Sequence, residues 1–223
     1  EGADIIDIGG ESTRPNSNTI DSLIEWNRVK SKIKYAKKKN FFVSIDTRKS
    51  FVLKKSLKLK INMLNDVSGL SFDNRMIKIL KQTQLPFVLH HMQGTPKTMQ
   101  KNPKYKNVLL DIYDFFEDQI KKFKYKNIII DPGIGFGKNL KHNLSLISKI
   151  SLFHSLGFPI LVGTSRKRFI NQIAGKYDSE ERIGGTLSSI LYLLSQGVQI
   201  FRVHNVREIK QGILVFEKIL DEK

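Results

Sequence analysis

The sequence predicts a parallel α/β barrel of the (β/α)8 type, represented by seven strand–helix units. Short apolar runs rich in β-branched residues alternate with longer amphipathic segments along the 223 residues, and such alternation requires crossover connections and a parallel sheet. The runs at 127–131 and 159–163 are apolar on both faces, as in strands that helices cover. Because a closed barrel needs eight strands, we expect residues 1–223 to form a single domain whose first unit is missing.

Each apolar run predicts one strand, and the segments between them have helical periodicity. The predicted strands are 5–8, 41–46, 61–66, 87–90, 127–131, 159–163 and 199–204. The predicted helices are 23–36, a short one after Lys49, 74–83, 109–123, 143–156, 180–196 and 206–220. The polar stretch 91–107 is long for a connection, which is typical of a functional loop.

An open doubly wound sheet is the alternative architecture, since it accepts any number of strands. Its glycine fingerprint is not found, because the glycine-rich stretch 131–138, DPGIGFGK, fits neither G-x-G-x-x-G nor the P-loop spacing. We therefore favour the barrel.

Composition narrows the class of protein. The 38 basic and 21 acidic residues give a formal charge of +17, which raises the possibility of a nucleic-acid partner. The lysines are scattered over the polar faces of predicted helices, so a general drift of the composition towards Lys, Ile and Asn explains them better, and we expect no nucleic-acid partner.

No apolar run approaches the ~20 residues of a membrane helix, no secretory leader is visible, and there is no cysteine. We expect a cytoplasmic protein without a membrane partner.

Polar side chains gather where the predicted strands end, which is where barrel enzymes place their chemistry. If alternate residues of each strand face inward, five of these side chains point into the same open end of the barrel: Asp46, Asn65, Asp131, Arg202 and His204. Carboxylates accept hydrogen bonds from a donor-rich ring, and Arg with His binds phosphate. Each residue alone has a structural explanation, such as helix capping or an ion pair. Their convergence predicts a ligand with a donor-rich heterocycle and an anionic tail.

Seven motifs carry a specific resemblance: DIGGESTRP, SIDTRK, ND, HMQGTPKTMQ, DPGIGFGKN, GTSRK and RVHNV. In order and spacing, the chain resembles the bacterial dihydropteroate synthases over essentially its whole length. The resemblance implies a (β/α)8 barrel and the condensation of 6-hydroxymethyl-7,8-dihydropterin diphosphate with 4-aminobenzoate, releasing diphosphate in folate synthesis. It also implies Mg²⁺ as cofactor and a homodimer through the last helices.

The resemblance further implies a role for each site residue. The pterin would be held by Asp46, Asn65, Asp131 and Lys167, with Met92, Gly135 and Phe136 beside it. The diphosphate would be bound by Arg202 and His204, and a mobile loop with Thr13, Arg14 and Pro15 would form the aminobenzoate pocket near Ser165 and Lys167. Asp46, Lys167, Arg202 and His204 would be the catalytic residues, with Asp46 stabilising a methylene cation after diphosphate leaves.

Two departures from the family pattern accompany the resemblance. The Asn that contacts Mg²⁺ lies on the family's first strand, so we expect no metal ligand of that kind in this chain, and we expect the chain alone to be weak or inactive. Asn205 stands where the family often has Asp. Three other readings stay open: a methyltetrahydrofolate-binding domain of a corrinoid methyltransferase, a basic nucleic-acid-binding protein, and a barrel kept only as a scaffold.

Overall fold

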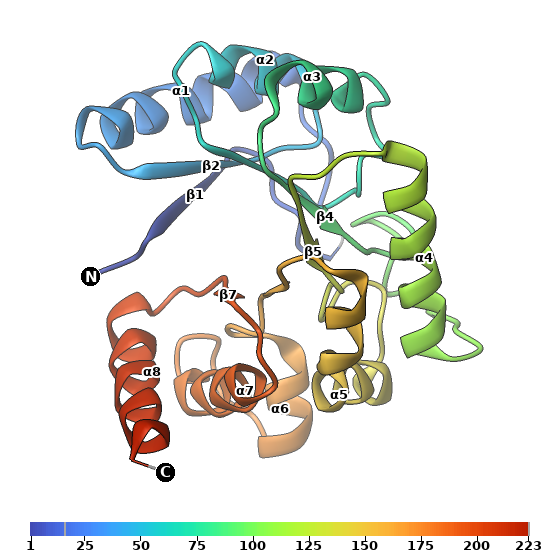
Figure 1. The fold of residues 1–223 in the computed structure, drawn as a ribbon, viewed down its shortest axis with the longest axis vertical. Coiled ribbons are helices and arrows are strands. Elements are labelled where there is room, and N and C mark those ends of the chain that lie inside the picture. Colours follow the sequence, from blue (N-terminus) through green and yellow to red (C-terminus); the bar gives the residue numbers. More distant parts are fainter. Residues whose placement is uncertain (16, 223) are drawn as a thin grey trace.

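The computed structural model describes residues 1–15 and 17–222. In this part of the chain, parallel strands line the centre and helices cover them on the outside (Figure 1). The strands are β1 (Ile5–Gly9), β2 (Phe42–Asp46), β3 (Met63–Asp66), β4 (Phe87–His90), β5 (Ile128–Asp131), β6 (Leu161–Val162) and β7 (Ile200–Phe201). The helices are α1 (Ser22–Lys38), α2 (Ser50–Leu57), α3 (Met76–Thr83), α4 (Val108–Phe123), α5 (Leu140–Ser148), the 3-10 helix η1 (Ile150–Leu156), α6 (Arg168–Ala174), α7 (Ile183–Ser195) and α8 (Val206–Asp221).

The strand order is that of a barrel and excludes a doubly wound sheet. Strands β1 to β5 pair in chain order, all parallel, and β6 pairs with β7 in the same direction. A bridge between Ile130 and Ile160 continues the order from β5 to β6. A doubly wound sheet reverses its order at a switch point, and none occurs among the described strands. The fold is therefore a (β/α)8-type barrel represented by seven strands.

Side chains connect β7 to β1, although no backbone ladder joins these two strands within the described residues. Figure 1 shows the two strands facing each other across a gap. Arg202 Nε donates to Asp7 Oδ2 at 2.7 Å, and Lys210 Nζ on α8 donates to the carbonyl of Gly2 at 2.7 Å. Polar side chains thus bridge β7 and α8 to the beginning of the described chain at this point.

The inside of the barrel has an apolar layer with a polar layer above it, as strand alternation requires. The apolar layer contains Met63, Val88 and Leu161, with Ile5, Ile129 and Ile200 packed on them. Two residues further along these strands come, in chain order, Asp7, Asn65, His90, Asp131, Gly163 and Arg202. The residues between them face outward, and most of these pack against the helices in one large core. The fold therefore gathers polar groups at the carboxyl ends of the strands.

Side chains cap the starts of α1, α4 and α5. Asp21 accepts a hydrogen bond from the amide of Leu23 at the start of α1, and Asn107 accepts from two amides at the start of α4. Asn139 and His142 form a capping box at α5. These side chains satisfy amides that a helix leaves without partners. None of the helices in the described part is long and apolar enough to span a bilayer.

Several predicted boundaries were wrong. The last two strands are two residues each, against predictions of 159–163 and 199–204, because β7 pairs along one edge only in the described residues. The predicted helix 143–156 is α5 followed by η1, and α6 was not predicted at all. Arg202 and His204 consequently lie in the segment after β7 and not within a strand.

Candidate active site

The pterin-side candidates surround Asp131, the last residue of β5. The Asp131 side chain is buried; its Oδ1 accepts from the amide of Gly133 at 2.8 Å, and its Oδ2 lies 3.9 Å from Nε2 of His90. Burial raises the pKa of Asp131, and the positive charge of Lys167 opposes that shift. Asp131 is thus a buried carboxylate, close to a cation, with capacity to accept further hydrogen bonds.

Lys167 comes from the loop after β6, and its charge acts on Asp131. Its Nζ donates to the carbonyl of Ile134 and lies 4.6 Å from the centre of the Phe136 ring. Burial lowers the pKa of Lys167 to about 8, although Asp131 acts in the opposite direction. Phe136 in turn packs edge-on against His90, with ring centres 4.5 Å apart. The structure therefore places Lys167 against Phe136, close enough to Asp131 for its charge to act on that carboxyl group.

The loop after β5 approaches β4 so closely that it requires glycine. Gly133 has φ +70°, and a Cβ there would lie 2.0 Å from the carbonyl oxygen of His91. Gly135 has φ +82°, and its Cβ would lie 2.9 Å from Cδ of Lys167. The glycines thus allow the loop to hold Phe136 beside Lys167, while Met92 lies half-buried at the start of the loop after β4.

A second group contains Arg202 and the acids around it. The guanidinium bonds to Asp7 at 2.7 Å and to Asp46 at 3.4 Å, and Asn65 Nδ2 donates to the same Asp7 oxygen at 3.1 Å. Burial raises the pKa of Asp46 to about 8, the negative charge of Asp7 adds to this effect, and Arg202 opposes it. Arg202 is partly exposed, with 48% of its side chain accessible, so a ligand has access to the guanidinium.

Sequence reasoning missed Asp7 as a member of this group. Asp7 accepts from both Arg202 and Asn65 through Oδ2, while its buried Oδ1 has no hydrogen-bond partner among residues 1–15 and 17–222. Strand alternation could have indicated this role. Asp7 and Gly9 face the same side of β1 because they are two residues apart, and Gly9 pairs in register with Asp46. Asp7 thus connects the predicted pterin and diphosphate ends of the site.

His204 and Ser165 form a pair between the segments after β7 and β6. Ser165 Oγ lies 2.9 Å from Nδ1 of His204, and the His204 amide donates to the same Oγ at 3.3 Å. Burial lowers the pKa of His204, and the charges of Arg166 and Arg202 lower it further. A neutral imidazole beside Arg202 offers a hydrogen-bond donor or acceptor to an anion.

The loop between β1 and α1 presents its predicted residues outward. Arg14 and Pro15 are exposed and Thr13 is half-buried. The loop follows the carboxyl end of β1, so it lies on the same side of the barrel as the other candidates. The positive charge of Arg14 contributes to the lowered pKa of His204.

Two adjacent histidines at the end of β4 are kept neutral by burial. His90 Nδ1 lies 3.0 Å from the carbonyl of Val67, and His91 Nδ1 lies 3.1 Å from Nζ of Lys138. Burial lowers the pKa of His91 to about 2, and it lowers the pKa of Lys138 well below its usual range. These groups were not among the predicted site residues; they support the loop that carries Phe136.

The sequence of the chain matches a known protein family. A family described as "Pterin binding enzyme" matches residues 1–204. The chain belongs to this family of pterin binding enzymes.

Curated relatives make the assignment finer. The dihydropteroate synthase of Escherichia coli K12 is 39% identical over 228 aligned residues, covering all of this chain and 80% of the relative. That of Neisseria meningitidis serogroup B is 36% identical and covers 98% of this chain and 80% of the relative. The function is accordingly dihydropteroate synthesis, a transferase reaction of folate synthesis.

Solved structures show the same fold. The Yersinia pestis dihydropteroate synthase with a sulfonamide drug complex has a TM-score of 0.94 and 34% identity, and the match covers 99% of this chain and 82% of that one. The Thermus thermophilus enzyme in complex with 4-aminobenzoate has a TM-score of 0.90 and 35% identity, covering 97% of this chain and 84% of that one.

Proposed function

We propose that the polar layer binds 6-hydroxymethyl-7,8-dihydropterin diphosphate with its ring at Asp131 and its diphosphate at Arg202, and that 4-aminobenzoate enters beside residues 13–15. The observation that supports this orientation is the separation of charge within the layer. A buried carboxylate lies at β5, and a partly exposed guanidinium lies at β7. A related Thermus thermophilus structure is described as a complex with 6HMPPP.

The pterin end uses complementary hydrogen bonds. The ring presents an amino group and a ring N–H on one edge, which suit the free acceptor capacity of Asp131, and a carbonyl that suits the ammonium of Lys167. Asn65 offers an amide, with both a donor and an acceptor, from the neighbouring strands. Bonds to an ionised partner are about twice as strong as neutral ones, so Asp131 carries most of the ring's recognition.

The diphosphate end relies on Arg202, His204 and Ser165. A guanidinium matches phosphate oxygens in a bidentate manner, and Arg202 exchanges its bonds to Asp7 and Asp46 for bonds to the ligand. The neutral His204, held by Ser165, donates through its other ring nitrogen. These groups neutralise the leaving group as its bond to carbon breaks.

Magnesium fits the chemistry of the donors that remain. Mg²⁺ usually takes one or two protein carboxylates and several substrate or water oxygens. Among the described residues no three acidic or histidine side chains are arranged to hold a metal ion by themselves. The buried Asp7 Oδ1, which has no partner among these residues, is a hard oxygen of the kind Mg²⁺ prefers. Asp7 would hold the ion with the diphosphate, and the ion when bound would supply additional positive charge against the leaving group.

The reaction needs no protein nucleophile. The carbon–oxygen bond to diphosphate breaks with both electrons leaving on the diphosphate. Asp46 stabilises the resulting positive charge on the methylene carbon in its ionised form, which the positive charge of Arg202 favours. The amine of 4-aminobenzoate then forms the carbon–nitrogen bond and loses one proton to solvent. Thr13, Arg14 and Pro15 close over the second substrate and exclude water.

We also place residues 1–223 in one domain. We propose that this domain pairs with a second copy through α7 and α8, and that the protein is cytoplasmic. Leu214, Val215 and Ile219 on α8 are each more than half exposed, which supports an apolar contact there. The lack of cysteine supports the cytoplasm.

The test is calorimetric binding of the pterin diphosphate to the whole chain and to Asp131→Asn. Two charge-assisted bonds at about 1.5 kcal/mol each predict a loss of roughly 100-fold in affinity. The exposed Asp118 on α4 provides a matched control, because Asp118→Asn removes the same charge away from the site. Unchanged affinity in Asp131→Asn would show that the ring binds elsewhere.

A further inference from the structure

The β1–α1 loop is fixed by a buried network at Glu11, two residues before Thr13. Glu11 Oε2 accepts from the amide of Ile20 at 2.9 Å, which joins the beginning of the loop to its end. Lys49 Nζ donates to Glu11 at 2.6 Å and to the carbonyl of Ile20 at 2.7 Å. Both polar groups of the Ile20 backbone are therefore bonded to this network.

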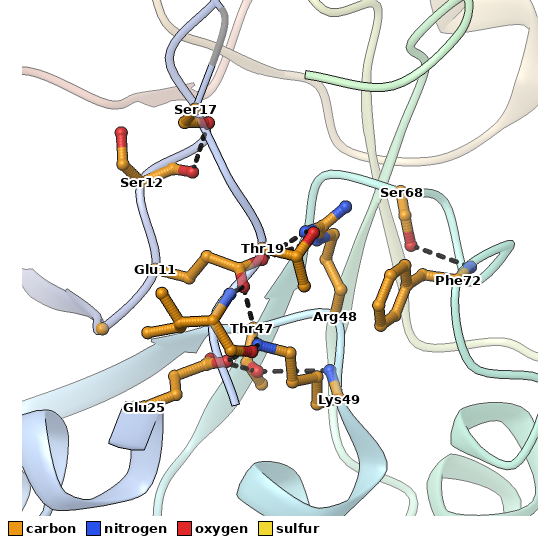
Figure 2. Close-up of polar contacts among 12 residues, drawn as sticks. Glu11, Ser12, Ser17, Thr19, Glu25, Thr47, Arg48, Lys49, Ser68 and Phe72 are labelled. Carbon is orange, nitrogen blue, oxygen red and sulfur yellow. Dashed lines mark hydrogen bonds and ion pairs between the residues drawn. The ribbon is translucent and has the colours of Figure 1, made fainter. Parts of the chain in front are cut away.

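The positive and negative charges of this buried network balance. Glu11 and Glu25 supply two negative charges, and Arg48 and Lys49 supply two positive ones; the side chains of all four are at most 7% exposed. Burial by itself would raise the pKa of Glu11, but hydrogen bonds from Lys49, from the Ile20 amide and from Arg48 hold it below its usual value. Figure 2 shows how these groups converge.

Arg48 makes contacts on two sides. One edge of its guanidinium donates to Glu11 Oε1 through Nε, at 3.0 Å, and through a terminal nitrogen, and this edge also reaches Thr19 Oγ1 at 3.4 Å. Its flat face lies 4.3 Å from the centre of the Phe72 ring. Phe72 belongs to the loop between β3 and α3, where its amide donates to Ser68 Oγ (Figure 2).

We propose that Arg48 is a positioning residue for 4-aminobenzoate: held between Glu11 and Phe72, it fixes the point from which residues 13–15 extend toward the site. The inference rests on the proposed role of residues 13–15 in that pocket. It assigns to Arg48 no contact with either substrate. The loop is thereby coupled to the β3–α3 loop, which follows Asn65 and Asp66 at the end of β3.

The geometry specifies arginine at this position. A lysine would keep the charge, but it has no planar fork to direct two N–H groups at Glu11 Oε1 and no flat face to stack on an aromatic ring. Arg48→Lys therefore keeps the network neutral but removes the paired donation to Glu11 and the stacking on Phe72, so the β1–α1 loop is held less firmly. Because effective reaction depends on sub-ångström placement, the pocket for the second substrate is affected first.

The experiment compares initial rates of Arg48→Lys with those of the unaltered chain, varying each substrate in turn. Where turnover of the chain is too slow to follow, the calorimetric Kd of each substrate takes the place of its KM. We expect KM for 4-aminobenzoate to rise roughly tenfold while KM for the pterin diphosphate stays within about twofold. Phe72→Leu, which keeps the apolar contact but removes the ring, shifts KM for 4-aminobenzoate in the same direction by about threefold. Hydrogen exchange at the Ile20 amide rises in both variants.

Two further variants separate the possible outcomes. Arg75→Lys is the matched control, since Arg75 pairs with Asp73 on the same β3–α3 loop and its side chain is 72% exposed; it leaves both KM values unchanged. Arg14→Ala tests the proposed function of the loop itself. If Arg14→Ala leaves KM for 4-aminobenzoate unchanged, the loop assignment fails. If Arg14→Ala raises that KM and Arg48→Lys does not, or raises both KM values equally, the positioning role is wrong. If Arg48→Lys does not fold, Phe72→Leu decides in the same way.

Discussion

Replacing Lys49 by methionine removes the cation that joins two buried acids, and the resulting loss of stability follows from the contacts. The Nζ atom bonds to Glu11 at 2.6 Å, to Glu25 at 2.7 Å and to the Ile20 carbonyl at 2.7 Å. Methionine fills a similar volume, so the lost interaction is polar. Glu11 keeps Arg48 and Glu25 keeps Thr47, which donates at 2.5 Å, but the network is left with a net negative charge away from water.

Breaking a buried ion pair in this way costs about 3–5 kcal/mol of unfolding free energy. For a domain of this size each kcal/mol corresponds to roughly 2–4 °C in Tm, so we expect Lys49→Met to melt about 6–20 °C below the unaltered chain. The assay is urea unfolding monitored by circular dichroism, with thermal melts in parallel. Lys54→Met is the control, because Lys54 is exposed on α2 and its change lies within about 0.5 kcal/mol.

The double variant Lys49→Met/Glu25→Gln provides the decisive comparison. Removing the charge of Glu25 together with that of Lys49 restores neutrality, so the double variant recovers about 1–3 kcal/mol relative to Lys49→Met. A loss below about 1 kcal/mol in Lys49→Met, or a double variant less stable than the single one, would refute the reasoning that this network is held by its charge balance.

Three further predictions concern acid titration, backbone geometry and metal. The pKa of Asp46 is raised to about 8 in the folded chain, so its contribution to stability is present at low pH and is lost as pH rises from about 4 to about 8. Asn does not titrate, so the unfolding free energy of Asp46→Asn, measured in urea, increases relative to that of the unaltered chain over this pH range. Above about pH 8 the difference is constant. Gly133→Ala costs more than about 3 kcal/mol because its Cβ would meet the carbonyl of His91, whereas Gly157→Ala, at φ +78° with open space around it, costs about 1 kcal/mol in the same melts. Chelation of Mg²⁺ weakens calorimetric binding of the pterin diphosphate but not of a pterin without phosphates, and Asp7→Asn makes this difference smaller; equal effects of chelation on both ligands would contradict the Mg²⁺ assignment.

The sequence was sufficient to predict the barrel and most of its polar layer, because both depend on local periodicity. Alternation within a strand determines which residues face inward, and the end of each apolar run indicates where the mouth lies. Asp46, Asn65 and Asp131 could be placed in one layer for this reason. Arg202 could be placed there too, even though β7 ends one residue earlier.

The side-chain partners could not be predicted in the same way. Glu11 and Arg48 are 37 positions apart, and Asp7 and Arg202 are 195 positions apart; neither separation leaves a periodic signal. Which acid pairs with which base depends on packing between loops, and the sequence offers many basic residues as alternatives. The short helix α6 was missed because two turns contain too few positions to establish a pattern.

The contact between Asp7 and Arg202 also constrains the order in which the chain assembles. It closes a loop of nearly the whole chain, and the entropy lost in closing a loop increases with its length. The strands between these two residues can pair with close neighbours first, so this contact forms late, when little other freedom remains. A molecule that binds there recognises chains that have finished folding, and it increases their population by mass action. Added early during refolding, such a molecule should raise the yield of folded chain without accelerating the first strand pairings.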